Sequence, residues 1–292
     1  METVTMTWNY LSEISDTVWD NRDKRVDGWP LMSSPVPTLL MCAAYVYIVK
    51  VWGPNFMKNR KPYNIRFFLI WYNAFQVVLS TYIFVQIFRG GWMGDYSFRC
   101  QPVDYSDNPK ALLMVHACYM YYLSKFTEFF DTFCFVARKK FGHVSLLHVV
   151  HHGIMPLSVW PGMRFMPGGH ASFFGLLNAF VHIFMYAYYM LAALGPKYQR
   201  FIWWKQHMTT LQMVQFVGIM VHGFQLIFYD DCDFPWQFAY YIAAHAVMFF
   251  ILFGQFYIST YIVKQTKQTD ASIKSDGKAN DVNGNTYKSK IS

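Results

Sequence analysis

The chain has 292 residues, of which 54% are hydrophobic and only 14% are charged, whereas an average soluble domain carries about 25% charged residues. This composition excludes an ordinary soluble domain and indicates a polytopic membrane protein. The formal net charge of +8 lies in short loops and in the C-terminal region, so nucleic-acid binding does not explain it.

Several apolar stretches are long enough to cross a bilayer. Residues 67–88 and 238–263 contain no Asp, Glu, Lys or Arg, and each exceeds the roughly 18 residues that indicate a membrane span. The stretches are continuous rather than alternating, so we predict an all-α fold. Seven transmembrane helices are predicted, at residues 36–52, 67–88, 111–136, 144–160, 171–194, 205–228 and 238–263.

The distribution of charge predicts the orientation. Lys and Arg gather in the loops after the first, third, fifth and seventh helices, whereas the opposite loops mix basic residues with Asp. The positive-inside rule then places the N-terminus in the lumen and the C-terminus in the cytosol. We divide the chain into a lumenal segment, residues 1–30, which lacks the features of a signal peptide, a catalytic seven-helix domain, residues 31–265, and a disordered cytosolic tail, residues 266–292.

The third predicted helix carries charges at helical spacing. Lys125, Glu128 and Asp131 lie three residues apart, so their side chains share one face. Opposite charges inside a membrane bundle are usually tolerated because they pair with one another. A purely architectural ion-pair network and a functional role both fit this pattern.

The fourth predicted helix contains His148, His151 and His152. Positions i, i+3 and i+4 of a helix share a face, so three imidazoles can project into one cavity. Ionisable side chains at membrane depth are costly and usually functional, and imidazole can act as a base, a nucleophile or a metal ligand. The alternative is a polar contact between helices.

The fifth predicted helix places Asn178 and His182 one turn apart, so they can share a cavity wall. Tyr186, Tyr188 and Tyr189 follow in the same helix. For Tyr188 and Tyr189, an aromatic belt at the membrane interface is an equal alternative to a place in the cavity.

In the sixth predicted helix, Gln212 and Gln215 lie three residues apart. They fit two interpretations, namely hydrogen bonds between helices or contacts with a substrate. The periodicity does not separate the two.

The five cysteines divide by depth. Cys42, Cys118 and Cys134 lie inside predicted helices and are interpreted as inert core residues. Cys100 and Cys232 lie in two lumenal loops, a compartment that permits disulfides. We favour a bridge between them, and two separate thiols are the alternative.

The chain ends with Lys288 and Lys290 at the third and fifth positions from the C-terminus. This spacing resembles the dilysine signal that returns membrane proteins to the endoplasmic reticulum. A lysine-rich tail also produces such a spacing by chance, but the predicted cytosolic location places these lysines on the side of the membrane where such a signal is recognised.

Four blocks together resemble the animal type of the very-long-chain fatty acid elongase family. The signatures of that family are K-x-x-E-x-x-D-T, H-x-x-H-H, H-x-x-M-Y-x-Y-Y and T-x-x-Q-x-x-Q. They match residues Lys125–Thr132, His148–His152, His182–Tyr189 and Thr209–Gln215, in order and without departure. The resemblance covers about residues 25–265.

The resemblance implies a 3-ketoacyl-CoA synthase, an acyltransferase that joins an acyl-CoA to malonyl-CoA with loss of carbon dioxide and CoA. It also implies that predicted helices two to seven form a six-helix barrel around a substrate tunnel. The tunnel is expected to open to the cytosol in an endoplasmic reticulum membrane. No cofactor and no metal is expected. The expected partners are the two CoA substrates, the bilayer and the other enzymes of the elongation cycle, and a homodimer is left open.

By the same resemblance, His151 is the predicted acyl acceptor, and desolvation is expected to keep its imidazole neutral and nucleophilic. His148 and His152 orient His151 or move protons, and His182 assists decarboxylation or carbanion attack. Asn178 donates a hydrogen bond to the developing oxyanion. The other residues predicted to bind substrate are Lys125, Glu128, Asp131, Tyr186, Tyr189, Gln212 and Gln215.

Three lysines lie near the predicted cytosolic mouth, namely Lys139, Lys205 and Lys264. They are predicted to contact the phosphates of CoA. The alternative is that they only determine topology.

Two other classes of function share some of these features. A membrane di-iron desaturase or hydroxylase also uses H-x-x-H-H, but it needs several such boxes to supply its ligands, and the other histidines of this chain are scattered singly. A seven-helix receptor or transporter shares the topology but does not account for four dense polar blocks. Metal analysis and product formation linked to decarboxylation separate these alternatives from an elongase.

Overall fold

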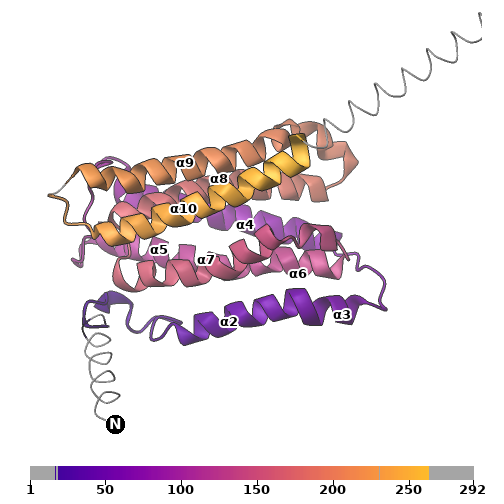
Figure 1. The fold of residues 1–292 in the computed structure, drawn as a ribbon, viewed down its shortest axis with the longest axis horizontal. Coiled ribbons are helices and arrows are strands. Elements are labelled where there is room, and N and C mark those ends of the chain that lie inside the picture. Colours follow the sequence, from indigo (N-terminus) through magenta and orange to yellow (C-terminus); the bar gives the residue numbers. More distant parts are fainter. Residues whose placement is uncertain (1–16, 18, 230, 263–292) are drawn as a thin grey trace, which may run out of the picture.

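Helices that run roughly side by side form the described part of the chain (Figure 1). The computed structural model describes residues 17, 19–229 and 231–262, and regular secondary structure within those residues is helical throughout. This confirms the all-α prediction for the described residues. The principal elements are α2 (Val36–Tyr47), α3 (Gly53–Met57), α4 (Arg66–Ile87), α5 (Pro109–Thr127), α6 (Phe129–Ala137), α7 (Leu146–Phe165), α8 (Ser172–Ala193), α9 (Met208–Phe224) and α10 (Trp236–Tyr257).

Five helical segments are long and apolar enough to cross a membrane, namely Val36–Met57, Arg66–Trp92, Gly169–Ala193, Met208–Phe228 and Trp236–Thr260. They correspond to five of the seven predicted helices. The other two predictions fall on α5–α6 and on α7, whose lysine, carboxylate, histidine and tyrosine side chains lower the mean hydropathy. The chain is therefore a helical multi-pass membrane protein, and its two most polar helices are the ones that carry the charged and histidine blocks.

The first apolar segment is longer than predicted. A π-helical stretch, Ile48–Trp52, joins α2 to α3, so one helical rod runs over Val36–Met57 instead of ending near residue 52. Pro37 lies in the first turn of α2, where a missing backbone N–H interrupts no helical hydrogen bond. Pro37 therefore marks where the rod begins.

The helices pack in pairs. The most extensive contacts join α4 to α8 and α9 to α10, and α2 packs against α7. In Figure 1, α2 and α3 lie along one edge of the bundle, and α9 and α10 lie along the opposite edge. α5 to α8, which carry three of the polar blocks, lie between these edges, and α9 carries the fourth along one edge. Most of the polar residues in these blocks are buried inside the bundle.

A disulfide joins Cys100 to Cys232, with an S–S distance of 2.09 Å. It connects the loop before α5 to the loop before α10. Buried Leu226, Phe234 and Ala239 pack around the two cysteines. The backbone N–H of His170 donates to the carbonyl oxygen of Gln101 at 2.7 Å, which ties the same loop to the start of α8. These contacts hold one end of the bundle together.

Part of the predicted N-terminal segment packs onto the same end of the bundle. Val26 and Met32 are fully buried in an apolar cluster with Trp160 of α7. Arg164, at the end of α7, is buried and donates to a carboxylate oxygen of Asp27. That hydrogen bond holds the pKa of Asp27 below its ordinary value. The segment before α2 is thereby fastened to α7, whereas the predicted tail, residues 266–292, lies outside the described residues.

Candidate functional site

A cavity lies among α6, α7, α8, α9 and α10. All four sequence blocks contribute to its wall, although they are far apart in the chain. The predicted site residues that line it are Asp131, His148, His151, His152, Asn178, His182, Tyr189, Gln212 and Gln215. The bundle thus brings together most of the polar residues that the sequence singled out.

The start of α7 determines how the three histidines are arranged. Ser145 caps this helix, because its side chain accepts a hydrogen bond from the backbone N–H of His148. The helical spacing then places the three imidazoles beside one another. Ring centroids are 4.4 Å apart for His148 and His152, and 5.2 Å apart for His151 and His152.

His148 is held by a chain of hydroxyl groups. Its Nε2 lies 2.9 Å from Oγ1 of Thr132, and that oxygen lies 2.8 Å from the phenol oxygen of Tyr45. Tyr45 belongs to α2, at the edge of the bundle. The first helix therefore supports the site through Thr132, a contact that sequence reasoning did not identify.

His151 has a different environment from its two neighbours. Its ring packs edge-on against Phe249, with centroids 4.8 Å apart, and Phe253 follows at 6.2 Å. Both phenylalanines come from α10. His151 is therefore the imidazole that lies where the polar wall of the cavity meets an apolar wall.

Glu128 links the two helices that carry histidines. Its Oε1 accepts from Nζ of Lys125 at 2.6 Å and lies 3.3 Å from Nδ1 of His182. Its Oε2 lies 3.8 Å from Nδ1 of His152, a separation too long for a hydrogen bond. A carboxylate beside Nδ1 orients an imidazole and leaves Nε2 as the nitrogen with a free lone pair. Glu128 is thus placed to orient His182, whereas His152 lies beside the carboxylate without a hydrogen bond to it.

Lys125 and Glu128 do not line the cavity but lie buried behind its wall. Nζ of Lys125 also donates to Oδ1 of Asn178 at 3.1 Å, and the phenol of Tyr121 donates to the same oxygen at 2.9 Å. Because Oδ1 accepts both bonds, the amide NH₂ of Asn178 remains the group that can donate toward the cavity. Of the three charged residues predicted to share one helix face, Lys125 and Glu128 therefore form a buried ion pair behind the wall.

The remaining predicted residues differ in their positions. Asp131 reaches the cavity and accepts a hydrogen bond of 2.7 Å from the phenol of Tyr186, which is itself buried behind the wall. Tyr189 lines the cavity, as does Tyr188. Both glutamines line it as well, and Oε1 of Gln215 has no hydrogen-bond partner among the described residues.

The three predicted lysines are not part of the described cavity wall. Lys139 is half-buried, has a positive φ of 54°, and donates to the carbonyl oxygen of Lys58 at 3.1 Å. The side chain of Lys205 and the whole of Lys264 lie outside the described residues, as do Lys288 and Lys290.

Sequence reasoning missed the apolar part of the cavity wall. Met185, Phe216, Phe253 and Phe256 line the cavity and come from three different helices. No local pattern distinguishes an apolar residue that faces a cavity from one that faces lipid or core. Thr209 was visible as the first residue of its block, and it also lines the cavity.

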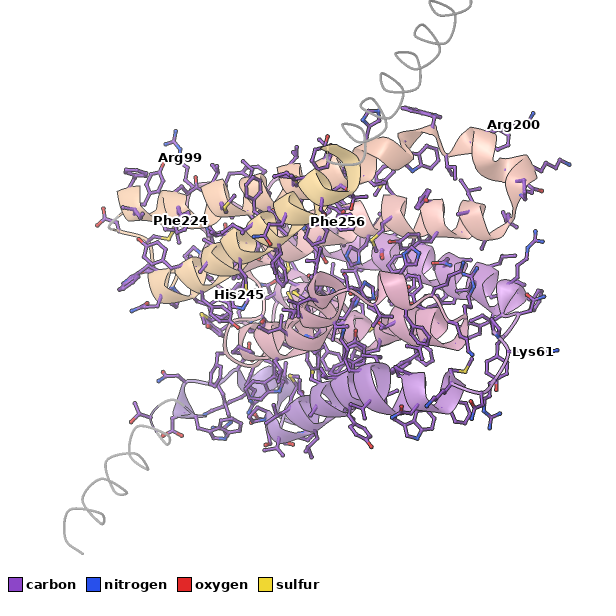
Figure 2. All side chains as sticks on the ribbon, turned by 45° about the vertical axis from the view of Figure 1, so that its right-hand side comes forward. Lys61, Arg99, Arg200, Phe224, His245 and Phe256 are labelled. Carbon is purple, nitrogen blue, oxygen red and sulfur yellow. A yellow bond between two sulfur atoms is a disulfide. The ribbon has the colours of Figure 1, made fainter. Side chains whose placement is uncertain are left out.

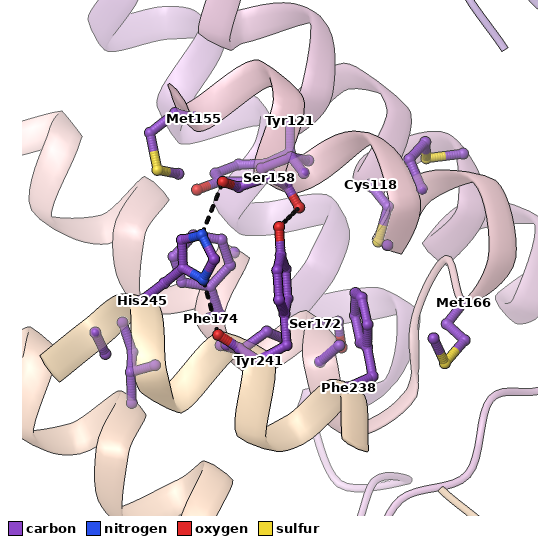
Figure 3. Close-up of a pocket in the computed structure, with 18 of the residues that line it drawn as sticks. Cys118, Tyr121, Met155, Ser158, Met166, Ser172, Phe174, Phe238, Tyr241 and His245 are labelled. Carbon is purple, nitrogen blue, oxygen red and sulfur yellow. Dashed lines mark hydrogen bonds between the residues drawn. The ribbon is translucent and has the colours of Figure 1, made fainter. Parts of the chain in front are cut away.

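A second cavity lies toward the disulfide end of the bundle, and its wall is mostly apolar (Figure 3). Phe216 of α9 lines both cavities. Along α10, Phe256 lines the first cavity and His245 lines the second, and Figure 2 shows them at successive positions between Lys61 at one end of the bundle and Arg99 at the other. A polar histidine cavity therefore adjoins a mostly apolar cavity.

Metal binding requires several ligand side chains in one place. Within the described residues, no three His, Cys, Asp or Glu side chains are grouped so that they could hold a metal ion. The geometry of the described histidines therefore gives no support to the di-iron alternative.

Comparison with known proteins identifies relatives over most of the chain. Residues 30–269 match the family model described as ELO: GNS1/SUR4 family. The chain is 54% identical to "Very long chain fatty acid elongase 7" of Drosophila melanogaster over 280 residues, which is 96% of this chain and 84% of that relative. It is 48% identical to "Very long chain fatty acid elongase 7" of Rattus norvegicus over 240 residues, covering 82% of this chain and 85% of the relative. It is 42% identical to "Very long chain fatty acid elongase 1" of Homo sapiens over 245 residues, covering 84% and 88%.

Proposed function

Because the chain belongs to the ELO, GNS1/SUR4 family, we propose that it elongates fatty acids as an acyltransferase of the 3-oxoacyl-CoA synthase type. In this reaction an acyl-CoA and malonyl-CoA give a 3-ketoacyl-CoA that is two carbons longer, together with carbon dioxide and free CoA. The observation that carries the proposal is the junction of a histidine-lined cavity with an apolar cavity at Phe216. The first suits the reacting thioester, and the second suits a long acyl chain.

We further propose that α5–α6 and α7 span the membrane with the five most apolar helices, giving seven spans. Spans two to seven form a six-helix barrel around the two cavities in this proposal. The histidine cavity faces the cytosol, where the CoA thioesters are supplied, and the disulfide end faces the lumen. The extensive α4–α8 and α9–α10 contacts and the position of α2 at the edge support this arrangement.

In the first chemical step, an imidazole nitrogen of His151 attacks the thioester carbonyl. The C–S bond breaks, CoA leaves as the thiol after it takes up a proton, and an acyl-imidazole remains. The position of His151 between the polar and apolar walls supports this role, because the acyl chain can extend past Phe249 while CoA stays on the polar side.

In the second step, malonyl-CoA loses carbon dioxide, and the resulting carbanion attacks the acyl carbon and displaces His151. His182, oriented by Glu128, is placed across the cavity to assist this step. The amide of Asn178 can donate to the oxyanion that develops on the acyl carbonyl. His148 and His152 complete the cluster by fixing its geometry and carrying protons.

The test of the function is elongation by the purified full-length chain. Incubation with acyl-CoA primers of different lengths and malonyl-CoA labelled in its methylene carbon should give labelled 3-ketoacyl-CoA two carbons longer than each accepted primer. One carbon dioxide should be released per product. Reactions without primer serve as the control. Primer-independent carbon dioxide release, or absence of labelled product with every primer, would contradict the proposal.

We propose that the protein lies in the endoplasmic reticulum membrane. We also propose that the other enzymes of the elongation cycle are its partners, because the 3-keto group must be reduced, dehydrated and reduced again before the chain is saturated. Lys288→Ser combined with Lys290→Ser should let a fraction of the protein leave that membrane, as measured by microscopy, while activity per molecule stays unchanged. Lys274→Ser with Lys278→Ser removes the same charge from the tail and should leave the location unchanged. If both double variants stay in the endoplasmic reticulum membrane, another determinant retains the protein there.

A further inference from the structure

Three polar side chains form a hydrogen-bonded group in the mostly apolar wall of the second cavity. Ser158 of α7 and Tyr241 and His245 of α10 meet there (Figure 3). Oγ of Ser158 lies 3.0 Å from Nε2 of His245, and Nδ1 of His245 lies 2.8 Å from the backbone carbonyl oxygen of Tyr241. The phenol of Tyr241 donates to the backbone carbonyl oxygen of Ser158 at 3.3 Å. We call these three residues the polar trio.

The hydrogen bonds assign the protons of the polar trio. A carbonyl oxygen can only accept, so Nδ1 of His245 carries the proton of the neutral ring. Nε2 is then an acceptor, and the hydroxyl of Ser158 must donate to it. The phenol proton of Tyr241 is likewise committed to a carbonyl. All three donors are therefore used inside the trio, whereas the oxygens of Ser158 and Tyr241 keep lone pairs at the cavity wall.

A second serine in the same wall shows the contrast. Oγ of Ser172 donates to the carbonyl oxygen of Gly169 at 2.6 Å and accepts from Nε1 of Trp92 at 2.9 Å. Its donor and an acceptor position are both satisfied by the protein. Ser158 has a protein partner for its proton only, so it differs from Ser172 in offering an unmatched acceptor to whatever fills the cavity.

A serine that donates to an imidazole can also be a nucleophile, but the position of Ser158 does not suit that role. Ser158 lies in the interior of α7, where backbone N–H groups are engaged within the helix and cannot stabilise an oxyanion. It also lies seven residues beyond His151 in the sequence, which is roughly 10 Å along the helix axis. A thioester at His151 is therefore out of its reach, and the methylene chain is what passes the trio.

We propose that the polar trio selects acyl chains that carry a hydroxyl group at this depth of the cavity. The inference rests on the proposed function, because it takes the second cavity to be the place of the acyl chain. A chain hydroxyl is a donor, and it can bond to the unmatched oxygen of Ser158 or Tyr241. The cavity continues past the trio to Met163 and Met166, so the preferred hydroxyl lies within the chain rather than at its end.

The test uses primers of one chain length that carry a single hydroxyl at successive positions, each compared with the unsubstituted primer by kcat/KM. A hydroxyl that reaches the polar trio should raise kcat/KM by up to about tenfold, the equivalent of about 1.4 kcal/mol for one net hydrogen bond. Hydroxyls at other depths should lower it, since they bury an unpaired donor. The expected result is a single maximum along the series.

Variants then assign that maximum to the polar trio. In Ser158→Ala/His245→Leu the ratio between the best hydroxylated primer and the plain primer should fall to about one, and Tyr241→Phe should lower it in part. Ser172→Ala is the matched control and should keep the wild-type ratio. If the double variant does not fold, Tyr241→Phe and Ser172→Ala still make the comparison.

The outcomes separate this inference from the proposed function. Elongation of plain primers with no favoured hydroxyl position would overturn the role of the polar trio and leave the function intact. A maximum that survives in all trio variants would overturn it as well. If no primer is elongated, the function itself fails, and the thermal stabilisation of the protein by acyl-CoA analogues with and without the hydroxyl shows whether the cavity still prefers a hydroxylated chain.

Discussion

Replacement of His151 by Ala is expected to abolish the release of CoA from acyl-CoA in the absence of malonyl-CoA. If His151 carries the acyl group, wild-type protein mixed with acyl-CoA alone should release at most one equivalent of CoA in a burst and gain the mass of one acyl chain. His151→Ala should show neither, and its elongation rate should fall by several orders of magnitude because the covalent route is lost. Intact-mass analysis and a thiol assay measure the two signals.

Two controls make the burst experiment specific. His116→Ala removes a histidine that contacts Trp29 and lines neither of the two cavities, so it should leave the burst unchanged. His182→Ala should abolish condensation while part of the burst remains, because the role proposed for His182 follows acyl transfer. A wild-type protein that releases no CoA and gains no mass would favour direct attack within a ternary complex, with His151 as a general base.

Replacement of Glu128 by Ala is expected to damage both stability and activity. The substitution leaves the ammonium group of Lys125 buried without its 2.6 Å partner. Breaking a buried pair in this way typically costs about 3–5 kcal/mol. His182 also loses the carboxylate that orients its Nδ1, so kcat should fall by roughly 10²–10⁴-fold. Thermal unfolding in a fixed detergent and elongation kinetics measure the two effects.

A double variant separates these two roles of Glu128. Lys125→Met/Glu128→Leu removes both charges and fills the space with apolar atoms, so most of the lost stability should return. Activity should stay low, because no carboxylate orients His182. Recovery of activity together with stability would show that Glu128 only compensates Lys125 and that its contacts with the histidines are incidental.

The sequence predicted the long helices well because period and hydropathy are local properties. Residues 67–88 and 238–263 lack charges, and the structure has helices over Arg66–Ile87 and Trp236–Tyr257 there. The ends were less predictable. The first helix was predicted to end at residue 52, yet the π-helical stretch after α2 extends it to Met57. Such a junction depends on packing against neighbouring helices and leaves little trace in composition.

The histidine cluster was visible for a similar reason. Three imidazoles at i, i+3 and i+4 share a face of any helix. The three-residue spacing of Lys125 and Glu128 likewise indicates an ion pair on one helix face. These properties follow from helical geometry, and the sequence by itself determined them, together with the family to which the chain belongs.

Only the tertiary structure decided which residues meet across helices. It placed Glu128 behind the cavity rather than in its wall, joined Tyr45 to His148 through Thr132, and brought Phe216 to the boundary of two cavities. It also paired Ser158 with His245, which lie 87 residues apart. The physical reason is that the periodicity of a helix states which of its residues share a face, whereas the neighbour of that face is decided by the packing of all the helices at once.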